Sequence, residues 1–210
     1  MLDPFYLIVD SADWLARLLP CGVRLVQLRI KDQPDATIRA AIARSKALCR
    51  EFGAQLIIND YWQQAIDAGC DFVHLGQGDL DTADLPVIRR AGRRLGISTH
   101  DEAELARALE LEPDYVALGP IYPTILKQMA FAPQGLPRIT EWKRKIGNMP
   151  LVAIGGITLE RVKDVWQAGA DSAAVVTDIS FNKDPEQRTR DWVKATRELV
   201  HFSDCDARES

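Results

Sequence analysis

Residues 151–176, LVAIGGITLERVKDVWQAGADSAAVV, contain one complete repeat of the pattern that decides the fold of this chain. The segment begins with the apolar run Leu151–Ile154 and ends with a second apolar run, Ser172–Val176. Between the two runs, apolar side chains recur at three- and four-residue intervals, which predicts an amphipathic helix: Val162, Val165 and Trp166. Thr158 is a candidate N-cap of this helix and Gly169 a candidate end. The segment therefore predicts a strand, a helix and a second strand.

The same unit recurs along the whole chain of 210 residues. The apolar runs are continuous rather than alternating, which is typical of parallel strands covered on both faces. The runs are Phe5–Val9, Val23–Leu28, Gln55–Ile58, Phe72–Leu75, Leu95–Ser98, Tyr115–Leu118, Leu151–Ile154 and Ser172–Val176. Eight strand–helix units in a chain of this length predict a single-domain α/β fold, a closed (β/α)₈ TIM barrel.

An open, doubly wound sheet is the alternative fold. Such a sheet normally has fewer strands and a glycine-rich loop after the first one, but the first run here leads into Asp10-Ser11-Ala12. We therefore favour the barrel, with a catalytic domain over residues 1–202. Residues 203–210 are polar and are predicted to form a disordered tail.

Composition excludes several classes of protein. The 26 Lys and Arg against 30 Asp and Glu give a net charge of −4, which argues against general nucleic-acid binding but not against a small anionic ligand. No apolar run is long enough for a membrane span. The four cysteines show no CxxC spacing and the first residues resemble no signal peptide, so we expect reduced thiols in a cytoplasmic protein. A homo-oligomer stays open.

Polar residues gather where the predicted strands end. In a (β/α)₈ barrel these carboxyl ends, with the loops after them, form the active site. The residues at these positions, in strand order, are Gln27, Arg29, Lys31, Asn59, Asp60, His74, Asp79, Ser98, His100, Thr124, Lys127, Gly155, Gly156, Val176 and Thr177.

Each of these patterns also has a purely structural explanation. Asp60 and Asp79 follow adjacent strands and suit Mg²⁺, although an aspartate at the start of a helix more often caps it. The glycine pair Gly155–Gly156 suits a phosphate-binding loop, but a tight turn would also use glycine. No serine or cysteine is paired with a base, so no nucleophile is indicated. The residues alone therefore predict a phosphate-handling barrel enzyme that needs magnesium.

The motifs together resemble the thiamine-phosphate synthase family, from about Tyr6 to Ile179. The similar segments are Gln27–Lys31, Ile58–Asp60, Val73–Asp79, Gly96–His100, Ala117–Thr124, Gln134–Leu136, Val152–Ile157 and Gly169–Asp171. The resemblance implies the same barrel fold. It also implies a transferase that joins 4-amino-5-hydroxymethyl-2-methylpyrimidine diphosphate to 4-methyl-5-(2-phosphooxyethyl)thiazole, releasing pyrophosphate.

The resemblance also implies a role for each candidate residue. Arg29, Lys31 and Asn59 would hold the diphosphate, with Thr124 and Lys127 contributing from the loop after the sixth strand. Asp60 and Asp79 would bind Mg²⁺, and Gln27 and Ser98 would orient the aminopyrimidine. The thiazole phosphate would lie against three further residues: Gly156, Val176 and Thr177. No role for His100 follows.

Two positions depart from the family pattern. The loop normally reads Pro-Thr-x-Thr-Lys, and here Leu126 replaces the second threonine. Thr177 replaces a more usual serine. Weaker substrate binding is expected from the lost hydroxyl. Two alternative functions remain: a thiazole tautomerase, and a non-catalytic relative that binds thiazole phosphate. Only the synthase should release pyrophosphate from both substrates with Mg²⁺.

Overall fold

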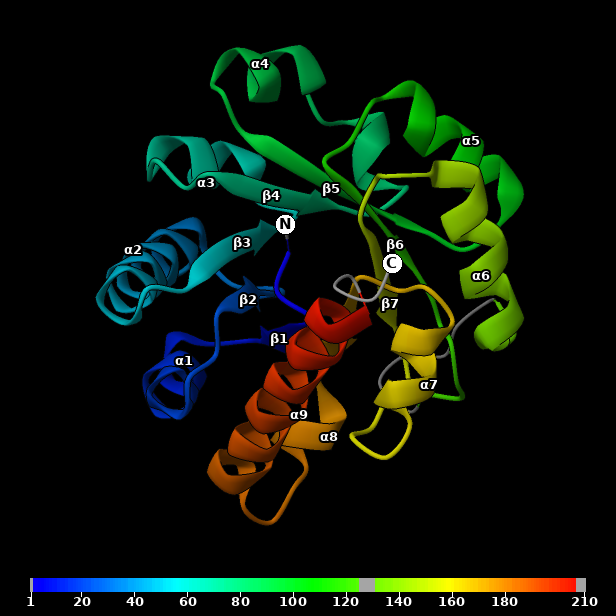
Figure 1. Ribbon diagram of the computed structural model, residues 1–210. Coiled ribbons are helices and arrows are strands. Elements are labelled where there is room, and N and C mark those ends of the chain that lie inside the picture. The colour runs from blue at the N-terminus through cyan, green and yellow to red at the C-terminus, as the bar shows by residue number, and fades with distance from the viewer. Residues whose placement is uncertain (1, 125–130, 207–210) are drawn as a thin grey trace.

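Eight parallel strands close into a barrel because β8 pairs with β1 as well as with β7 (Figure 1). This computed structural model describes residues 2–124 and 131–206. The strands are β1 Phe5–Val9, β2 Leu25–Leu28, β3 Gln55–Asn59, β4 Phe72–Leu75, β5 Arg94–Thr99, β6 Tyr115–Leu118, β7 Leu151–Ile154 and β8 Ser172–Val175. All eight predicted strands are confirmed, with shifts of one or two residues at some ends.

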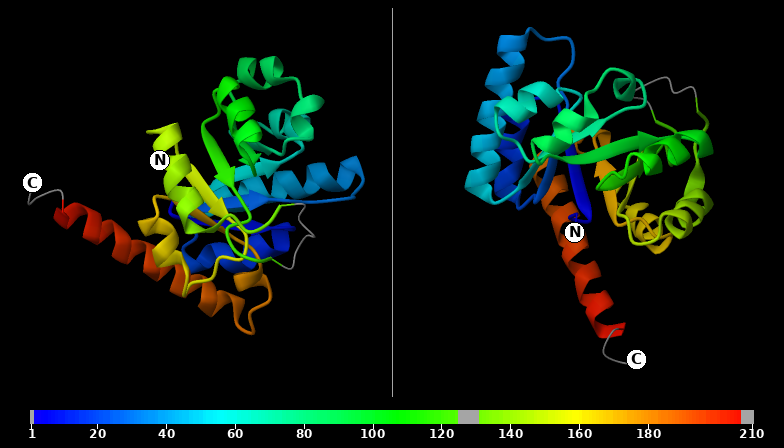
Figure 2. Two further views of the ribbon diagram at one scale, coloured as in Figure 1. Left: turned by 90° about the vertical axis from the view of Figure 1, so that its right-hand side faces the viewer. Right: turned by 90° about the horizontal axis from the view of Figure 1, so that it is seen from above.

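Helices surround the barrel, and most of them connect one strand to the next (Figures 1 and 2). They are α1 Ala12–Leu18, α2 Asp35–Phe52, α3 Trp62–Asp67, α4 Leu85–Arg90, α5 Glu102–Glu110, α6 Gly135–Ile146, α7 Val162–Gln167, α8 Thr177–Ser180 and α9 Pro185–Asp206, with short 3₁₀ turns η1 Leu19–Cys21 and η2 Asp79–Asp81. None of the helices within the described ranges combines the length and apolar character that a membrane crossing requires.

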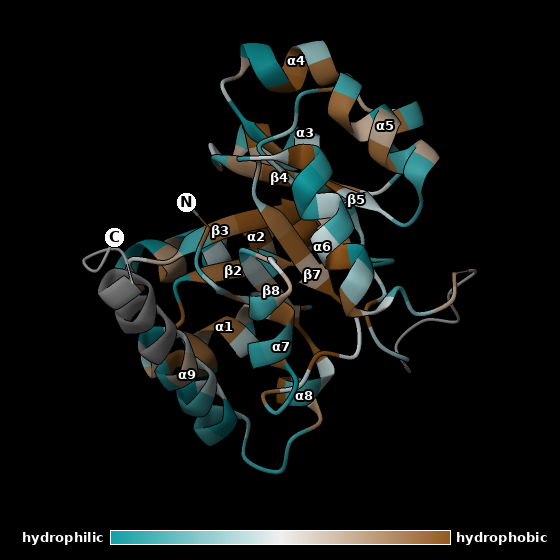
Figure 3. Ribbon diagram, turned by 45° about the vertical axis from the view of Figure 1, so that its right-hand side comes forward, coloured by the Kyte–Doolittle hydropathy of each residue, from teal (hydrophilic) through white to brown (hydrophobic). Residues whose placement is uncertain are grey.

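The apolar core has two layers. One lies between the strands and the helices, and the other fills the inside of the barrel. In Figure 3 the strands are mostly hydrophobic, whereas the helices carry much of the hydrophilic colour. Because successive side chains of a strand point to opposite faces, each strand contributes to both layers. This explains why the strand runs are continuously apolar.

The start of α7 differs from the sequence-based prediction. Thr158 was expected to cap this helix, but α7 begins at Val162, after a turn in which the Arg161 N–H donates to the Thr158 carbonyl. The N-cap residue is Arg161, whose side chain makes no capping hydrogen bond. The apolar face was predicted correctly, since Val162 and Val165 are buried.

The last helix is held to the barrel by aromatic packing and by polar contacts, of which those of Asp178 are the most buried. The Asp178 carboxylate, at α8, accepts hydrogen bonds from Arg188 Nε at 2.9 Å and from Trp192 Nε1 at 2.7 Å. The Trp192 ring stacks on Phe5 at a centroid distance of 5.1 Å. The bounds of α9 include residues 203–206, the first half of the segment predicted as a polar tail.

Candidate active site

The charged residues predicted for the site come from the carboxyl ends of three adjacent strands. Arg29 and Lys31 follow β2, Asp60 follows β3, and Asp79 begins η2 after β4. These four residues are called the charged cluster below. The structure brings them together: Asp60 is affected electrostatically by each of the other three. Their positions in the sequence alone do not show how close their side chains lie.

Asp60 carries the most perturbed carboxyl group of the cluster. Burial first, and then the neighbouring Asp79 carboxylate, raise the pKa of Asp60 from 3.8 to about 6. The positive charges of Lys31 and Arg29 act in the opposite direction and lower it. Raising the pKa disfavours the charged form, so two half-buried carboxylates are held side by side at an electrostatic cost.

The backbone explains how Asp60 reaches this position. Asp60 has a φ of 63°, in the left-handed region where aspartate is one of the few tolerated side chains. Its N–H donates to the His74 carbonyl of β4 at 3.0 Å, so the turn after β3 is fixed to the neighbouring strand. Asp79 is fixed separately, because its carboxylate accepts a hydrogen bond from the Gly76 N–H at 3.0 Å.

The charged cluster fits a magnesium ion. Mg²⁺ is usually held by one or two carboxylates, and substrate phosphates and water complete its shell. Within the described ranges no group of three or more His, Cys, Asp or Glu gathers, so a protein-only metal site is not formed there. The Asp60–Asp79 pair supplies the two carboxylates, and a cation beside Asp60 would offset the burial and the neighbouring negative charge that together raise its pKa.

The loops after β6 and β7 lie in close contact beside Gly156. Gly156 has a φ of 64°, and a Cβ added there would lie 2.4 Å from the Pro123 carbonyl oxygen. Only glycine therefore fits. Arg161 also contacts both loops, because its Nη1 donates to the Gly156 carbonyl at 2.9 Å while its guanidinium lies 4.7 Å from the centre of the Tyr122 ring.

The remaining predicted residues are distributed around the same end of the barrel. Val176 and Thr177 follow β8 at the start of α8, and Val176 packs against the apolar cluster inside the barrel. Thr124 is half-buried in the loop after β6. Lys127 and the departure at Leu126 lie outside the described residues.

Gln27 and Ser98 are joined through the inside of the barrel, although they stand on β2 and β5. Gln27 Nε2 donates to the Tyr6 hydroxyl at 2.8 Å, and Ser98 Oγ lies 2.8 Å from His74 Nε2. The Tyr115 hydroxyl connects the two halves, at 3.1 Å from Tyr6 Oη and 2.7 Å from His74 Nδ1.

Tyr6 and Tyr115 were not among the predicted site residues, and His74 was noted at a strand end without a role, but the sequence held a signal for all three. Inward-facing positions alternate along each strand, so Tyr6, His74 and Tyr115 could have been assigned to the interior by parity. Burial lowers the pKa of His74 to about 4, so its imidazole is neutral at physiological pH. A neutral imidazole has one donor and one acceptor nitrogen.

His100 does not belong to this chain of hydrogen bonds and instead connects neighbouring segments of the protein. Its Nδ1 lies 2.7 Å from the Glu104 carboxylate, which also accepts the His100 backbone N–H at 2.7 Å. Its ring stacks on Phe131 at a centroid distance of 4.7 Å. It therefore ties the end of β5 to α5 and to the segment before α6.

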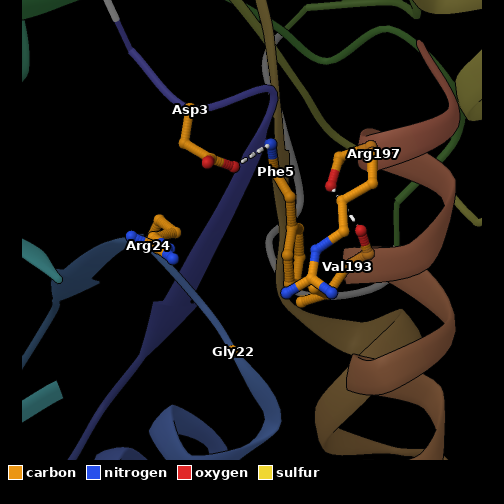
Figure 4. A pocket seen from close by; sticks show the side chains of 7 residues that line it. Asp3, Phe5, Gly22, Arg24, Val193 and Arg197 are labelled. Atoms are coloured by element: carbon orange, nitrogen blue, oxygen red, sulfur yellow. Dashed lines mark hydrogen bonds between the residues drawn. The ribbon is translucent and has the colours of Figure 1, made fainter. Parts of the chain in front are cut away.

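A separate cavity lies at the opposite, amino-terminal end of the strands (Figure 4). Asp3 and Arg24 line it just before β1 and β2, and Arg197 lines it from α9. None of the predicted site residues lines this cavity. The cavity therefore lies beside the start of β1 and the middle of α9, apart from the charged cluster.

Comparison with known proteins identifies the family to which the sequence is similar. The family model for thiamine monophosphate synthase matches residues 5–179. A thiamine-phosphate synthase of Rhizobium etli is 66% identical over 195 residues, covering 93% of this chain and 96% of the relative. A thiamine-phosphate synthase of Serratia proteamaculans is 50% identical over 197 residues, covering 94% and 90%. The solved structure of a thiamine phosphate pyrophosphorylase from Pyrococcus furiosus shares the fold, with a TM-score of 0.84, 24% identity and coverage of 94% and 97%.

Proposed function

The chain belongs to the thiamine monophosphate synthase family and acts as a thiamine-phosphate synthase, a transferase, and we propose that the charged cluster carries out the central step of its reaction. The reaction condenses 4-amino-5-hydroxymethyl-2-methylpyrimidine diphosphate with 4-methyl-5-(2-phosphooxyethyl)thiazole, giving thiamine phosphate and pyrophosphate. The single observation that supports our proposal most is the electrostatic contact of Asp60 with Asp79, Arg29 and Lys31.

The diphosphate is proposed to lie against the cationic part of the cluster. Arg29 and Lys31 balance its negative charge, and Asn59, which is buried at the end of β3, donates from its amide. Thr124 and Lys127 are assigned to the same anion from the loop after β6. Cations held near a departing anion stabilise the charge that develops on it, and one such contact commonly contributes about 10²–10³ in rate.

Bond breaking is proposed to precede bond making. The bond between the pyrimidine methylene carbon and the diphosphate oxygen breaks, and its electron pair leaves with pyrophosphate. The cation that remains is stabilised by the electron-rich aminopyrimidine ring, which Gln27 and Ser98 orient. The thiazole nitrogen then donates its lone pair to the methylene carbon. The protein supplies position and electrostatics rather than a nucleophile.

The thiazole phosphate is assigned to the opposite side of the barrel mouth. Gly156, Val176 and Thr177 come from the ends of β7 and β8. Phosphate is often bound in (β/α)₈ barrels by the loops after these two strands. The tight packing at Gly156 supports the assignment, because a side chain there would alter the loop backbone.

Mg²⁺ is proposed as the cofactor, held by Asp60 and Asp79. When bound, the ion supplies positive charge for the departing diphosphate. Arg29 and Lys31 provide the permanent part of that charge, and they also keep the pKa of Asp60 lower than burial alone would set it.

The decisive test is release of pyrophosphate by the purified chain. We expect pyrophosphate and thiamine phosphate in equal amounts when both substrates and Mg²⁺ are present, and neither when the thiazole phosphate or the ion is left out. A tautomerase would convert a thiazole isomer without pyrophosphate, and a binding protein would give no product. Either outcome would contradict the proposed reaction.

The cellular setting and assembly are also matters of proposal. We assign the enzyme to the cytoplasm, supported by the free thiols of Cys21, Cys49 and Cys70. Its partners are the two small-molecule substrates, and a homo-oligomer is compatible with the fold. Size-exclusion chromatography with light scattering measures the oligomeric state directly.

A further inference from the structure

A continuous chain of hydrogen bonds crosses the inside of the barrel from β2 to β5. In order, its members are Gln27, Tyr6, Tyr115, His74 and Ser98, with successive polar atoms 2.8, 3.1, 2.7 and 2.8 Å apart. Gln27 is 3% exposed, and the three middle residues are 1%, 0% and 6% exposed. Only Ser98, at one end, is less deeply buried. Water is therefore kept from the middle of the chain.

The number of available protons fixes the direction of donation along this chain of hydrogen bonds. Gln27 Nε2 donates to the Tyr6 hydroxyl oxygen, so the Tyr6 proton must be donated elsewhere. Among the residues that the structure describes, the only other hydrogen-bond partner of Tyr6 is Tyr115. Tyr6 therefore donates to Tyr115, and Tyr115 in turn donates to His74 Nδ1. This requires His74 to carry its proton on Nε2.

The direction of the chain decides what its two ends offer. His74 Nε2–H donates to Ser98 Oγ, which leaves the Ser98 hydroxyl proton free to be donated. At the other end, Gln27 turns an N–H toward Tyr6, which leaves its carbonyl Oε1 as the group free to accept. One end of the chain is thus a donor and the other an acceptor.

The two ends cannot change independently. Turning the Gln27 amide would make Tyr6 its donor, after which Tyr115 must donate to Tyr6 and His74 Nδ1 must donate to Tyr115. His74 Nε2 would then accept the Ser98 proton. Any partial change leaves a buried hydroxyl or ring nitrogen unpaired, which costs about tenfold or more in equilibrium population.

We propose that Tyr6, Tyr115 and His74 are positioning residues that hold Gln27 as an acceptor and Ser98 as a donor toward the pyrimidine ring, and so select a 4-aminopyrimidine over a 4-oxopyrimidine. This inference rests on the proposed assignment of Gln27 and Ser98 to that ring. An aminopyrimidine offers amino protons and ring-nitrogen lone pairs, which match an acceptor and a donor. A 4-oxopyrimidine presents a carbonyl oxygen and a ring N–H, which reverses this pattern.

Rejection of the oxo ring follows from the cost of reversing the chain. Binding it requires either an unpaired polar contact or the concerted reversal of every proton between Gln27 and Ser98. Sites that hydrogen-bond a substrate group reject mismatched analogues strongly, because buried polar groups are then left without partners.

The first experiment determines the direction of hydrogen-bond donation inside the barrel without any substrate. ¹⁵N NMR of the protein with labelled histidine reports which ring nitrogen of His74 carries the proton, and a His74→Gln variant assigns the signal. We expect a neutral ring protonated at Nε2. A neutral ring protonated at Nδ1 would overturn the proposal, because the chain would then run in the opposite direction.

The second experiment measures selectivity. Tyr115→Phe removes the hydroxyl that joins Tyr6 to His74, and we expect it to lower the preference for binding the 4-aminopyrimidine monophosphate over its 4-oxo analogue by about tenfold, measured as a ratio of dissociation constants. The KM for the thiazole phosphate should stay unchanged. His74→Gln, whose amide retains a donor and an acceptor, should keep more of the preference than His74→Leu.

A matched control separates positioning from general stability. Thr99→Val removes a buried hydroxyl from the same strand as Ser98, but that hydroxyl donates to the Ala117 carbonyl and is not part of the chain. We expect Thr99→Val to lower the melting temperature without changing the amino-to-oxo preference. An equal loss of preference in Thr99→Val and Tyr115→Phe would overturn the proposal.

The outcomes also separate this inference from the proposed function. If the wild-type chain releases no pyrophosphate, the proposed function fails, whatever the His74 tautomer is. If it releases pyrophosphate but Tyr115→Phe keeps the full amino-to-oxo preference, the proposed function stands and the selectivity role fails.

Discussion

At Asp60 three features meet in one residue: a left-handed backbone, a half-buried carboxyl group and a second carboxylate beside it. Each feature costs stability in a protein without ligand, and strained or repelling groups of this kind gather at functional sites. These features, together with the nearby cations Arg29 and Lys31, explain why Asp60 is the proposed metal ligand rather than an ordinary surface aspartate.

Replacing Asp60 tests its role in turnover. We expect Asp60→Asn to lower kcat by about 10²–10³, because the carboxylate charge is lost while the shape is kept. Pyrophosphate release at saturating substrates and Mg²⁺ measures this effect. The control is Asp81→Asn, an exposed aspartate two positions from Asp79 that pairs with Arg107, and it should retain wild-type activity. Full activity in Asp60→Asn would remove the metal assignment.

The same residue predicts a pH dependence of stability in the absence of Mg²⁺. The folded-state pKa of Asp60, about 6, lies above its ordinary value of 3.8, so the folded protein holds a proton that the unfolded chain releases. This contribution is fully present below about pH 4 and is lost as the pH rises through about 6.

Melting temperatures measured from pH 4 to pH 8 check this sign. Relative to Asp60→Asn, the wild-type melting temperature should fall as the pH rises from 4 to 7. Mg²⁺ added at neutral pH should restore more stability to the wild type than to the variant. Two parallel curves would mean that neither burial nor the Asp79 charge raises the pKa of Asp60 in the folded protein.

At the scale of the strand, Gly96 in β5 makes room for the hydrogen-bonded chain. A Cβ at Gly96 would lie 2.1 Å from Cζ of the Tyr115 ring. Overpacking of this kind commonly costs about 1–3 kcal/mol. We expect Gly96→Ala to lower the free energy of unfolding, measured in urea, by about 3 kcal/mol, the upper end of this range. Gly78→Ala, where a Cβ meets nothing within 4 Å, serves as the control and should change stability by less than about 0.5 kcal/mol.

The junction of α8 and α9 gives a second prediction for elements. The Asp178 side chain is 9% exposed and pairs with the half-buried Arg188, so Asp178→Asn weakens the main ion pair of that guanidinium. We expect a loss of about 3 kcal/mol in the free energy of unfolding. Glu160→Gln breaks the other ion pair of Arg188, but Glu160 is 68% exposed and its loss should cost less than about 1 kcal/mol. Similar losses from the two variants would contradict the view that burial determines the effect.

Sequence predicted elements better than it predicted contacts between them. The strands follow from continuous apolar runs, a local signal, and all eight were found. The start of α7 was missed because the Arg161–Thr158 turn has no distinctive local pattern. The hydrogen-bond chain inside the barrel was missed for another reason: it joins Tyr6 and Tyr115, which are 109 positions apart and lie on strands that do not pair with each other. The charged cluster was found because strand ends converge in any closed barrel.

At the scale of the whole molecule, we propose that residues 1–202 form the complete catalytic domain. Trp192, Val193 and Thr196 are buried residues in the middle of α9. A chain that stops after residue 202 keeps all three. We expect its melting temperature to lie within about 2 °C of the wild type and its kcat to be unchanged.

A chain that stops after residue 191 is the contrasting variant. It loses Trp192 and with it the stacking contact to Phe5 and the hydrogen bond to Asp178, so we expect it to be strongly destabilised or unfolded. Thermal unfolding followed by circular dichroism compares the two. If the longer chain also melted early, the last residues of α9 would belong to the domain.

Because β8 pairs with β1, every strand of the closed barrel has two neighbours. The same pairing would therefore form if the chain began at a different strand. Asp3 and Arg197 line one cavity on the face away from the charged cluster, so a link between the start of β1 and α9 would not cross the active site. Joining them through a short peptide and opening the chain before β5, at Gly92–Arg93, would give a circular permutant with every strand neighbour preserved. Gene rearrangement could thus change the starting point of this polypeptide without relocating its catalytic groups.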